Sequence, residues 1–144
     1  DVQAVSISRD GTRMAGVVRV GDRTELWLSG VIRNNDGVPA RLGEPIIAGS
    51  IEGEAVSMAW TDDVTVAVVV RSGTETNLVE QVVGGASGGV AGPAGVSIST
   101  VATATSSVRL RSEEGGLYVR RGANWLQTAE GILLLAVQQG TPQQ

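Results

Sequence analysis

Apolar and polar residues alternate along most of this chain in short runs that end at turn residues. The clearest example is the run 69–78, V-V-R-S-G-T-E-T-N-L, which nearly repeats the run 17–26, V-V-R-V-G-D-R-T-E-L, at a constant offset of 52 residues. Both runs read V-V-R-x-G-x-x-T-x-L, with a polar glycine-containing turn between two apolar segments. This pattern is typical of a β-hairpin, and hairpins that recur every ~40–50 residues are typical of a β-propeller.

The first 50 residues predict four antiparallel strands. The segment 2–8 contains a strict alternation at 5–8, and Asp10-Gly11 is a strong signal for a tight turn. Further strands are predicted at 13–20, 25–31 and 43–48. Pro45 suits an edge strand, where its missing N–H does no harm. Four such strands make one propeller blade.

The second unit restates this course. Ala55–Ala59 matches Ala4–Ser8 at an offset of 51, and the continuous apolar run 64–71 predicts a strand that is buried on both faces. The segment 77–83 supplies the third strand. We expect a flexible loop over the glycine-rich segment 84–89 and the fourth strand within 90–98.

The third unit is degraded, and two alignments compete for it. One places Val96-Ser97-Ile98 on Val56-Ser57-Met58, at an offset of 40. The other, which we prefer, takes 101–104 as the first strand and Ser106-Ser107 as the turn. It is followed by predicted strands at 108–112, 116–120, 125–128 and 132–137.

We therefore predict an all-β fold of three consecutive four-stranded antiparallel blades, a fragment of a β-propeller. The blades cover approximately residues 2–50, 51–99 and 100–138, and 139–144 form a flexible tail. Closed propellers have at least about four blades. We thus expect either a fragment of a larger ring or association between copies of the chain. The chain opens on Asp1-Val2-Gln3 without an initiator Met, which favours a piece of a longer protein.

The composition removes most catalytic and cofactor chemistry. The sequence has no His, Cys or Lys, which excludes the usual nucleophilic triads and ordinary zinc, copper or haem ligands. Asp62-Asp63 and Glu113-Glu114 are interpreted as turn acids rather than as calcium ligands or a glycosidase pair, and the glycine-rich loop lacks a P-loop ending. We predict no catalytic residue, cofactor or metal site. The net charge of −4 also disfavours nucleic acid as a partner.

Two groups of residues are candidates for binding a partner. Arg109, Arg111, Arg120 and Arg121 cluster in the third unit, where they either contact an acidic partner or form a solvated strand face. Trp27 either packs in the core, as we also expect for the other aromatic residues, or lies exposed and stacks on a sugar or a protein partner.

The run V-S-I-S-R-D-G-T-R-M-A at 5–15 resembles the strand–turn–strand of TolB/WD40-like propellers. The resemblance extends over nearly the whole chain when more segments are added: E-L-W-L at 25–28, G-L-Y-V at 116–119, Trp125, and G-I-L-L-L-A at 131–136 followed by Q-Q-G-x-P. Together they resemble the C-terminal β-propeller of the actinobacterial lipoprotein LpqB family. All 11 basic residues are Arg, which agrees with a GC-rich source.

This resemblance implies a non-enzymatic interaction module on the outer side of the cytoplasmic membrane. The lipid anchor, the remaining blades and a GerMN-type domain are expected upstream of this fragment. Family members are implicated as accessory proteins of a two-component sensor histidine kinase, so we expect the kinase's extracytoplasmic domain as the partner. The alternative function is a propeller that binds carbohydrate or peptidoglycan.

Overall fold

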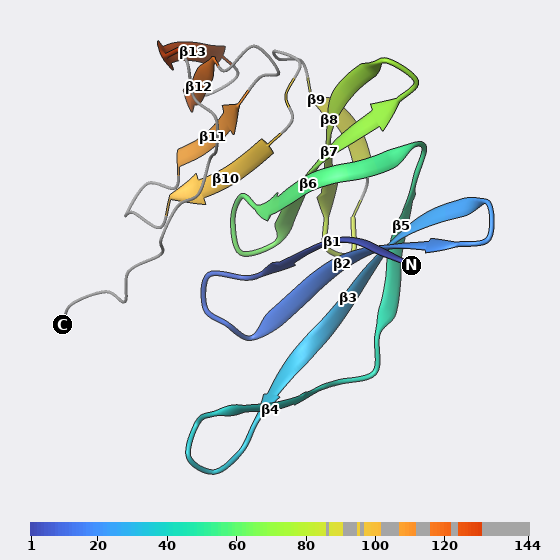
Figure 1. Cartoon of the computed structure of the whole chain (residues 1–144). Coiled ribbons are helices and arrows are strands. Elements are labelled where there is room, and N and C mark those ends of the chain that lie inside the picture. The colour runs from blue at the N-terminus through green and yellow to red at the C-terminus, as the bar shows by residue number, and fades with distance from the viewer. Residues whose placement is uncertain are drawn as a thin grey trace, which may run out of the picture.

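The computed structural model describes residues 1–85, 87–90, 95, 97–101, 107–111, 116–121 and 124–130. These residues form antiparallel strands, and they contain no helix. The strands group into three sheets. The second and third follow the chain as meanders, whereas in the first the last two strands both pair with the third. The sheets lie beside one another in chain order (Figure 1). The prediction of an all-β fold with antiparallel blades is confirmed.

The first sheet has five strands and a long central hairpin. Its strands are β1 (Val2–Ile7), β2 (Arg13–Val20), β3 (Arg23–Arg33), β4 (Pro39–Leu42) and β5 (Ile46–Ile51). β3 is long enough to pair with β5 along its first half and with β4 along its second half. The outer strand therefore lies at 46–51, somewhat after the predicted 43–48, because residues 39–42 already form an edge hairpin.

The second and third sheets have four described strands each. The second consists of β6 (Glu54–Trp60), β7 (Thr65–Ser72), β8 (Glu75–Val82) and β9 (Ser87–Val90). The third consists of β10 (Ser97–Val101), β11 (Ser107–Arg111), β12 (Leu117–Arg121) and β13 (Asn124–Ala129). The strand predicted at 132–137 lies outside the described residues.

The repeated run forms the same hairpin twice. Val17 pairs with Leu26 in the first sheet, and Val69 pairs with Leu78 in the second. Gly21 and Gly73 open the two turns with φ values of 64° and 65°. A positive φ at the first of two turn residues is the type II′ geometry, which glycine adopts without steric cost. The hairpin prediction is confirmed, and the two hairpins share one pairing register.

The central strand β7 is covered on both faces. Thr65 to Val70 are all buried. Val66, Val68 and Val70 belong to the apolar core between the first two sheets. Ala67 and Val69 belong to the core between the second and third sheets. Alternating β-branched residues thus bury both sides of one strand, as the sequence predicted.

Polar contacts also join neighbouring sheets. The indole N–H of Trp60 donates to the carbonyl oxygen of Ser6 at 3.1 Å. The hydroxyl of Thr24 donates to the carbonyl oxygen of Gly53 at 3.1 Å, at the link between the first and second sheets. The backbone N–H of Ile98 donates to the Ser57 hydroxyl at 3.0 Å between the second and third. These bonds fix the position of each sheet against the next.

The first strands of the units align differently from our predictions. Val5 pairs with Gly16 and Met58 pairs with Val68, so the offset between β1 and β6 is 53 rather than 51. Each of these two pairings has its own irregularity, between Val2 and Ala4 and between Ala55 and Ser57. These irregularities lie at equivalent positions, so they do not alter the offset. The offset differs from that of the hairpin because Ile7 pairs with Met14 and the equivalent Trp60 pairs with Val66, which makes the second turn one residue shorter.

The preferred alignment of the third unit is wrong. β10 is Ser97–Val101, and Ile98 pairs with Leu110 as Met58 pairs with Val68. This is the alternative alignment at an offset of 40, and it places the start of the third sheet before residue 100. The second sheet instead ends with β9, which takes Ser87 to Gly89 out of the expected loop and ends at Val90, where the fourth strand was expected to begin. In both segments the strand bounds follow from backbone pairing, which places few demands on the type of side chain.

Candidate interaction surface

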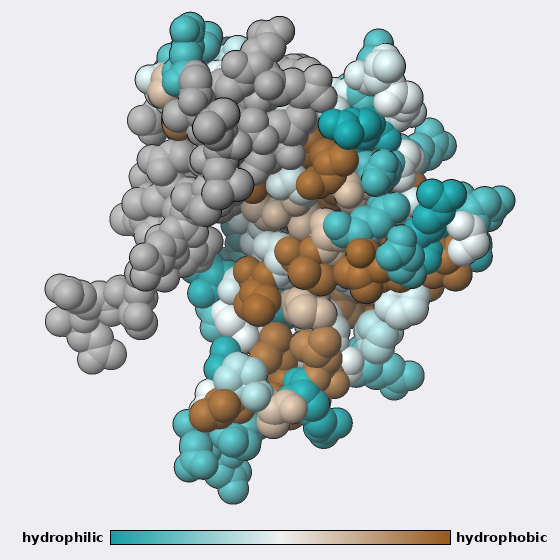
Figure 2. All heavy atoms as spheres, viewed as in Figure 1, coloured by the Kyte–Doolittle hydropathy of each residue, from teal (hydrophilic) through white to brown (hydrophobic). Residues whose placement is uncertain are grey.

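One side of the first sheet is apolar, and no other strand in the described part of the chain packs on it. We call it the outer face, because its opposite side packs on the second sheet. Strand pairing places these residues side by side on it: Val2, Val5, Ile7, Met14, Gly16, Val18, Trp27 and Ile47. Val2, Val5, Ile7 and Ile47 are each about 60% exposed. Figure 2 shows apolar surface in the middle of the view, over the first sheet of Figure 1.

Trp27 lies half-buried in β3 at the centre of this face. It lines an apolar hollow of about 210 Å³ together with Val5, Gly16 and Val18. Gly16 leaves the space open, since a Cβ there would meet Val5 only at an ordinary contact distance of 3.6 Å. The buried indole N–H of Trp27 has no acceptor among the described residues. The hollow is therefore shaped for an apolar side chain.

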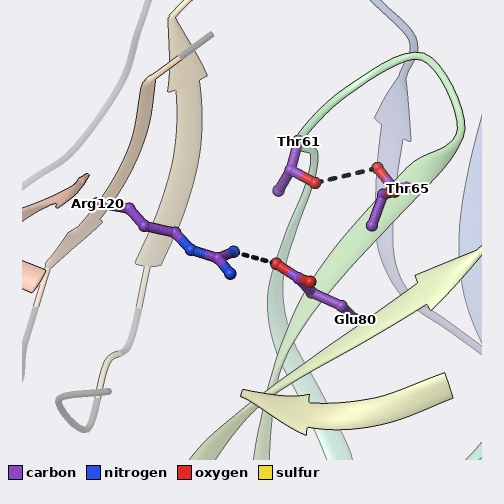
Figure 3. Close-up of polar contacts among 4 residues, drawn as sticks. All are labelled: Thr61, Thr65, Glu80 and Arg120. Carbon is purple, nitrogen blue, oxygen red and sulfur yellow. Dashed lines mark hydrogen bonds and ion pairs between the residues drawn. The ribbon is translucent and has the colours of Figure 1, made fainter. Parts of the chain in front are cut away.

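Arg120 is engaged within the chain. Its guanidinium forms an ion pair with Glu80, which joins the third sheet to the second (Figure 3). The same guanidinium lies 5.9 Å from the ring centroid of Trp125. Both charged side chains are about one quarter exposed. Arg120 thus supports the contact between sheets. Within the second sheet, the hydroxyl of Thr61 donates to the carbonyl oxygen of Thr65 at 3.4 Å, in the turn between β6 and β7 (Figure 3).

The other candidate arginines lie on the strands of the third sheet, where their backbone pairing places them. Arg109 pairs with Val119, Arg111 pairs with Leu117, and Arg121 pairs with Asn124. Arg109 and Arg111 occupy the strand positions that alternate with Leu110, and Leu110 is buried against the second sheet. The structure does not bring Trp27 and the arginines together, because they belong to the first and third sheets.

The remaining aromatic residues contribute to the packing between sheets. Trp60 is 5% exposed and belongs to the core between the first two sheets, where Arg13 lies 5.8 Å from its ring centroid. Tyr118 and Trp125 are partly buried against the core between the second and third sheets. Core packing is confirmed for Trp60, which leaves Trp27 as the tryptophan on an apolar open surface.

The match to a known family decides the identity of the domain. Residues 1–133 match the family described as the lipoprotein LpqB β-propeller domain. This chain belongs to that family. A search of curated proteins found no match. A β-propeller domain of this family accounts for the repeated antiparallel sheets.

The LpqB-type domain also has a polar hollow that the sequence did not predict. It has a volume of about 470 Å³ and lies between the first two sheets, at the ends of their central hairpins. Arg19 and Arg71, the arginines of the repeated run, both line it. Carboxylates of Asp22, Glu52 and Glu54 line it as well, so its charges are mixed. The constant offset of the repeat was the signal that could have placed both arginines at equivalent points of adjacent sheets.

No group of acidic residues in the described part of the chain could hold a metal ion. The turn acids instead bind backbone and hydroxyl groups. Hydrogen bonds from the Thr12 backbone N–H and from the hydroxyls of Ser8 and Thr12 lower the pKa of Asp10 from 3.8 to about 2. Asp62 accepts the backbone N–H of Val64 at 2.8 Å. Among the described residues, no helix is long and apolar enough to cross a membrane.

Proposed function

We propose that this domain is a non-catalytic interaction module of a cell-envelope lipoprotein, which binds the extracytoplasmic domain of a two-component sensor histidine kinase. The observation that carries the proposal is the family match over residues 1–133. The chemistry agrees with it, because the sequence has no His, Cys or Lys from which common nucleophilic or metal sites are built. The lipid anchor belongs to a part of the lipoprotein outside these residues, on the outer side of the membrane.

The third sheet supplies the candidate contact with the kinase. Arg109 and Arg111 follow one another at alternate positions of β11, and alternate residues of a strand share a face. Two guanidinium groups at this spacing suit an acidic patch on a partner, since Arg binds carboxylates in a bidentate geometry. Arg120 is left out of this contact, because its guanidinium already pairs with Glu80.

The test is binding of this chain to the purified extracytoplasmic domain of the kinase. Changing Arg109 and Arg111 together to Ala should weaken binding by about tenfold and reduce its dependence on salt. The matched control is Arg41→Ala, because Arg41 is an exposed arginine on β4 of the first sheet. No binding of the unmodified chain at high protein concentration would overturn the proposal.

Binding of carbohydrate or peptidoglycan is the second candidate function. Trp27 favours it, since a half-buried indole beside an apolar hollow can stack on the face of a sugar ring. Trp60 gives no support, because it is buried between the sheets. In this case Trp27→Ala should abolish retention on insoluble peptidoglycan, while Arg109→Ala with Arg111→Ala should leave it unchanged. Retention of Trp27→Ala at the level of the unmodified chain would exclude this function.

A further inference from the structure

The polar hollow between the first two sheets has one side that is held in place by both of them. The link between β5 and β6 forms this side, where Glu52 and Glu54 flank Gly53. The carbonyl oxygen of Gly53 accepts the Thr24 hydroxyl of the first sheet at 3.1 Å. Towards the second sheet, a Cβ at Gly53 would lie 2.6 Å from the carbonyl oxygen of Arg71. Both sheets therefore fix the backbone that carries the two glutamates.

Two arginines of the first sheet line the same hollow. Arg19 lies near the end of β2 and Arg23 begins β3, so they stand on either side of the hairpin turn. The Nε of Arg19 donates to the carbonyl oxygen of Gly21 at 3.2 Å, which holds this side chain beside the turn. The bond leaves the Nη1 and Nη2 groups, which can bind a carboxylate end-on with two hydrogen bonds.

The opposite charges around the hollow do not pair with each other. Among the described residues, no ion pair joins Arg19 or Arg23 to a carboxylate. Both arginines are exposed, as are Glu52 and Glu54. Arg71 also lines the hollow but is engaged in another interaction. Water therefore solvates the four exposed charged groups in the free domain, and a ligand with matching charges can replace that water.

The balance of charge selects the kind of ligand. The charged lining residues are three arginines and three acids, Arg19, Arg23 and Arg71 with Asp22, Glu52 and Glu54. An anion would be attracted by the arginines but repelled by the carboxylates, and the reverse holds for a cation. A ligand that carries one charge of each sign avoids both repulsions.

We propose that this hollow binds a short zwitterionic peptide. Arg19 and Arg23 hold its terminal carboxylate, and Glu52 and Glu54 hold its terminal ammonium group. The hydroxyls of Ser50 and Ser72, which also line the hollow, bond the amide groups between the two ends. The volume of about 470 Å³ is within the range of ligand pockets, ~300–1,000 Å³.

This site is separate from both candidate functions described above. Neither the arginines of β11 nor Trp27 lines the hollow. Loss of peptide binding would therefore leave the contact with the kinase and retention on peptidoglycan unaffected, and the proposals can fail independently.

The test is an NMR titration of the isotope-labelled full chain with triglycine, followed at the backbone amides of Gly53 and Gly73. Triglycine should shift both signals to saturation. Two blocked probes each lack one charge: acetyl-triglycine has no ammonium group, and triglycine amide has no carboxylate. Each should bind at least about tenfold more weakly than triglycine, because one end of the peptide loses its charged partners.

Variants assign the two ends of the peptide. Arg19→Gln with Arg23→Gln should bind triglycine and triglycine amide equally, while Glu52→Gln with Glu54→Gln should bind triglycine and acetyl-triglycine equally. Arg41→Gln, on an exposed arginine of β4, is the matched control and should keep both preferences. The spectrum of each variant also shows that it is folded.

Three results would overturn the proposal. The first is the absence of a saturable shift at Gly53 and Gly73 with triglycine. The second is equal binding of triglycine and one blocked probe by the unmodified chain, since the hollow would then recognise a single charge. The third is a preference for triglycine over its amide that survives in the folded arginine variant.

Discussion

At the scale of single residues, Asp10 shows how one carboxylate can organise a hairpin turn. Its Oδ1 atom accepts the backbone N–H of Thr12 at 3.0 Å and the hydroxyls of Ser8 and Thr12 at 2.7 Å each. The Ser8 hydroxyl oxygen in turn accepts the backbone N–H of Arg13 at 3.1 Å. The carboxylate thereby closes the connection between β1 and β2. Because these bonds favour the charged form, the pKa of Asp10 falls to about 2.

The pH dependence of stability should reveal this carboxylate. The pKa of Asp10 is about 2 in the folded chain and 3.8 without these bonds, so the unfolded state takes up the proton first as the pH falls. The contribution of the charge is thus complete above pH 3.8 and is lost as the pH falls toward about 2. The difference in unfolding free energy between the unmodified chain and Asp10→Asn should shrink over that interval in urea titrations. Asp63→Asn, in the turn between β6 and β7, is the control, and an equal pH effect for both variants would contradict the prediction.

Gly53 is a second residue whose local geometry restricts which side chain can stand there. Its φ is 118°, and a Cβ there would lie 2.6 Å from the carbonyl oxygen of Arg71 and 2.7 Å from a methyl carbon of Val70. We expect Gly53→Ala to reduce the free energy of unfolding by more than about 2 kcal/mol. Gly30→Ala is the control, since nothing lies within 4 Å of a Cβ at Gly30 and its φ is not positive. Chemical denaturation of both variants is the measurement, and similar values for the two would show that Gly53 is not constrained.

At the scale of the elements, the central hairpin of the first sheet combines a local signal with a contact to the link into the next sheet. The glycine that opens the turn acts locally, through its positive φ. Thr24, three residues later in the run, acts at longer range by donating to the carbonyl oxygen of Gly53. One short run thus specifies a hairpin and also ties it to the link into the following sheet. The second run, 69–78, shares the local part of this role, since Gly73 opens its turn with a positive φ.

Removal of the Thr24 hydroxyl should weaken this tie. Thr24→Val keeps the shape and the β-branched character of the side chain but leaves the Gly53 carbonyl without its donor. We expect a loss of about 1 kcal/mol in the free energy of unfolding. Thr24→Ser, which keeps the hydroxyl, should lose less than Thr24→Val. If the two variants ranked in the opposite order, the hydroxyl would have no part in joining the sheets.

At the scale of the whole molecule, the two contacts between sheets are built differently. Leu28 packs in the core between the first and second sheets. Its equivalent in the second sheet is Glu80, since Ala15 pairs with Leu28 as Ala67 pairs with Glu80. Glu80 meets Arg120 of the third sheet instead of an apolar partner (Figure 3). The second contact therefore has an ion pair at a position where the first has an apolar side chain.

A double-mutant cycle can measure this dependence. Glu80→Gln and Arg120→Gln, alone and together, should give a coupling energy of about 1 kcal/mol, because both side chains remain partly exposed. The coupling should decrease at high salt. As a control, Glu80→Gln and Arg41→Gln should be additive, since Arg41 belongs to β4 of the first sheet. A coupling that does not differ from zero at low salt would mean that the ion pair does not help to join the third sheet to the second.

The sequence by itself determined the local features of this protein. Alternation and β-branched residues determined the strands, glycine with a positive φ determined the hairpin turns, and the absence of His, Cys and Lys limited the chemistry. The burial of β7 on both faces could also be read from its apolar run. These properties depend on neighbouring residues, so a linear pattern contains them.

Only the tertiary structure decided which residues are equivalent and which surfaces are free. Strand pairing places the first strands at an offset of 53 between the first two units and of 40 between the second and third, and no composition signal reports either value. Tryptophans on neighbouring sheets, Trp27 and Trp60, were alike in the sequence but differ in burial. In the sequence, Arg120 could not be told apart from the neighbouring arginines as a candidate for binding a partner. Only the structure places Glu80, 40 residues away, beside it. Contacts between sheets depend on residues distant in the chain, which is why the pattern alone could not supply them.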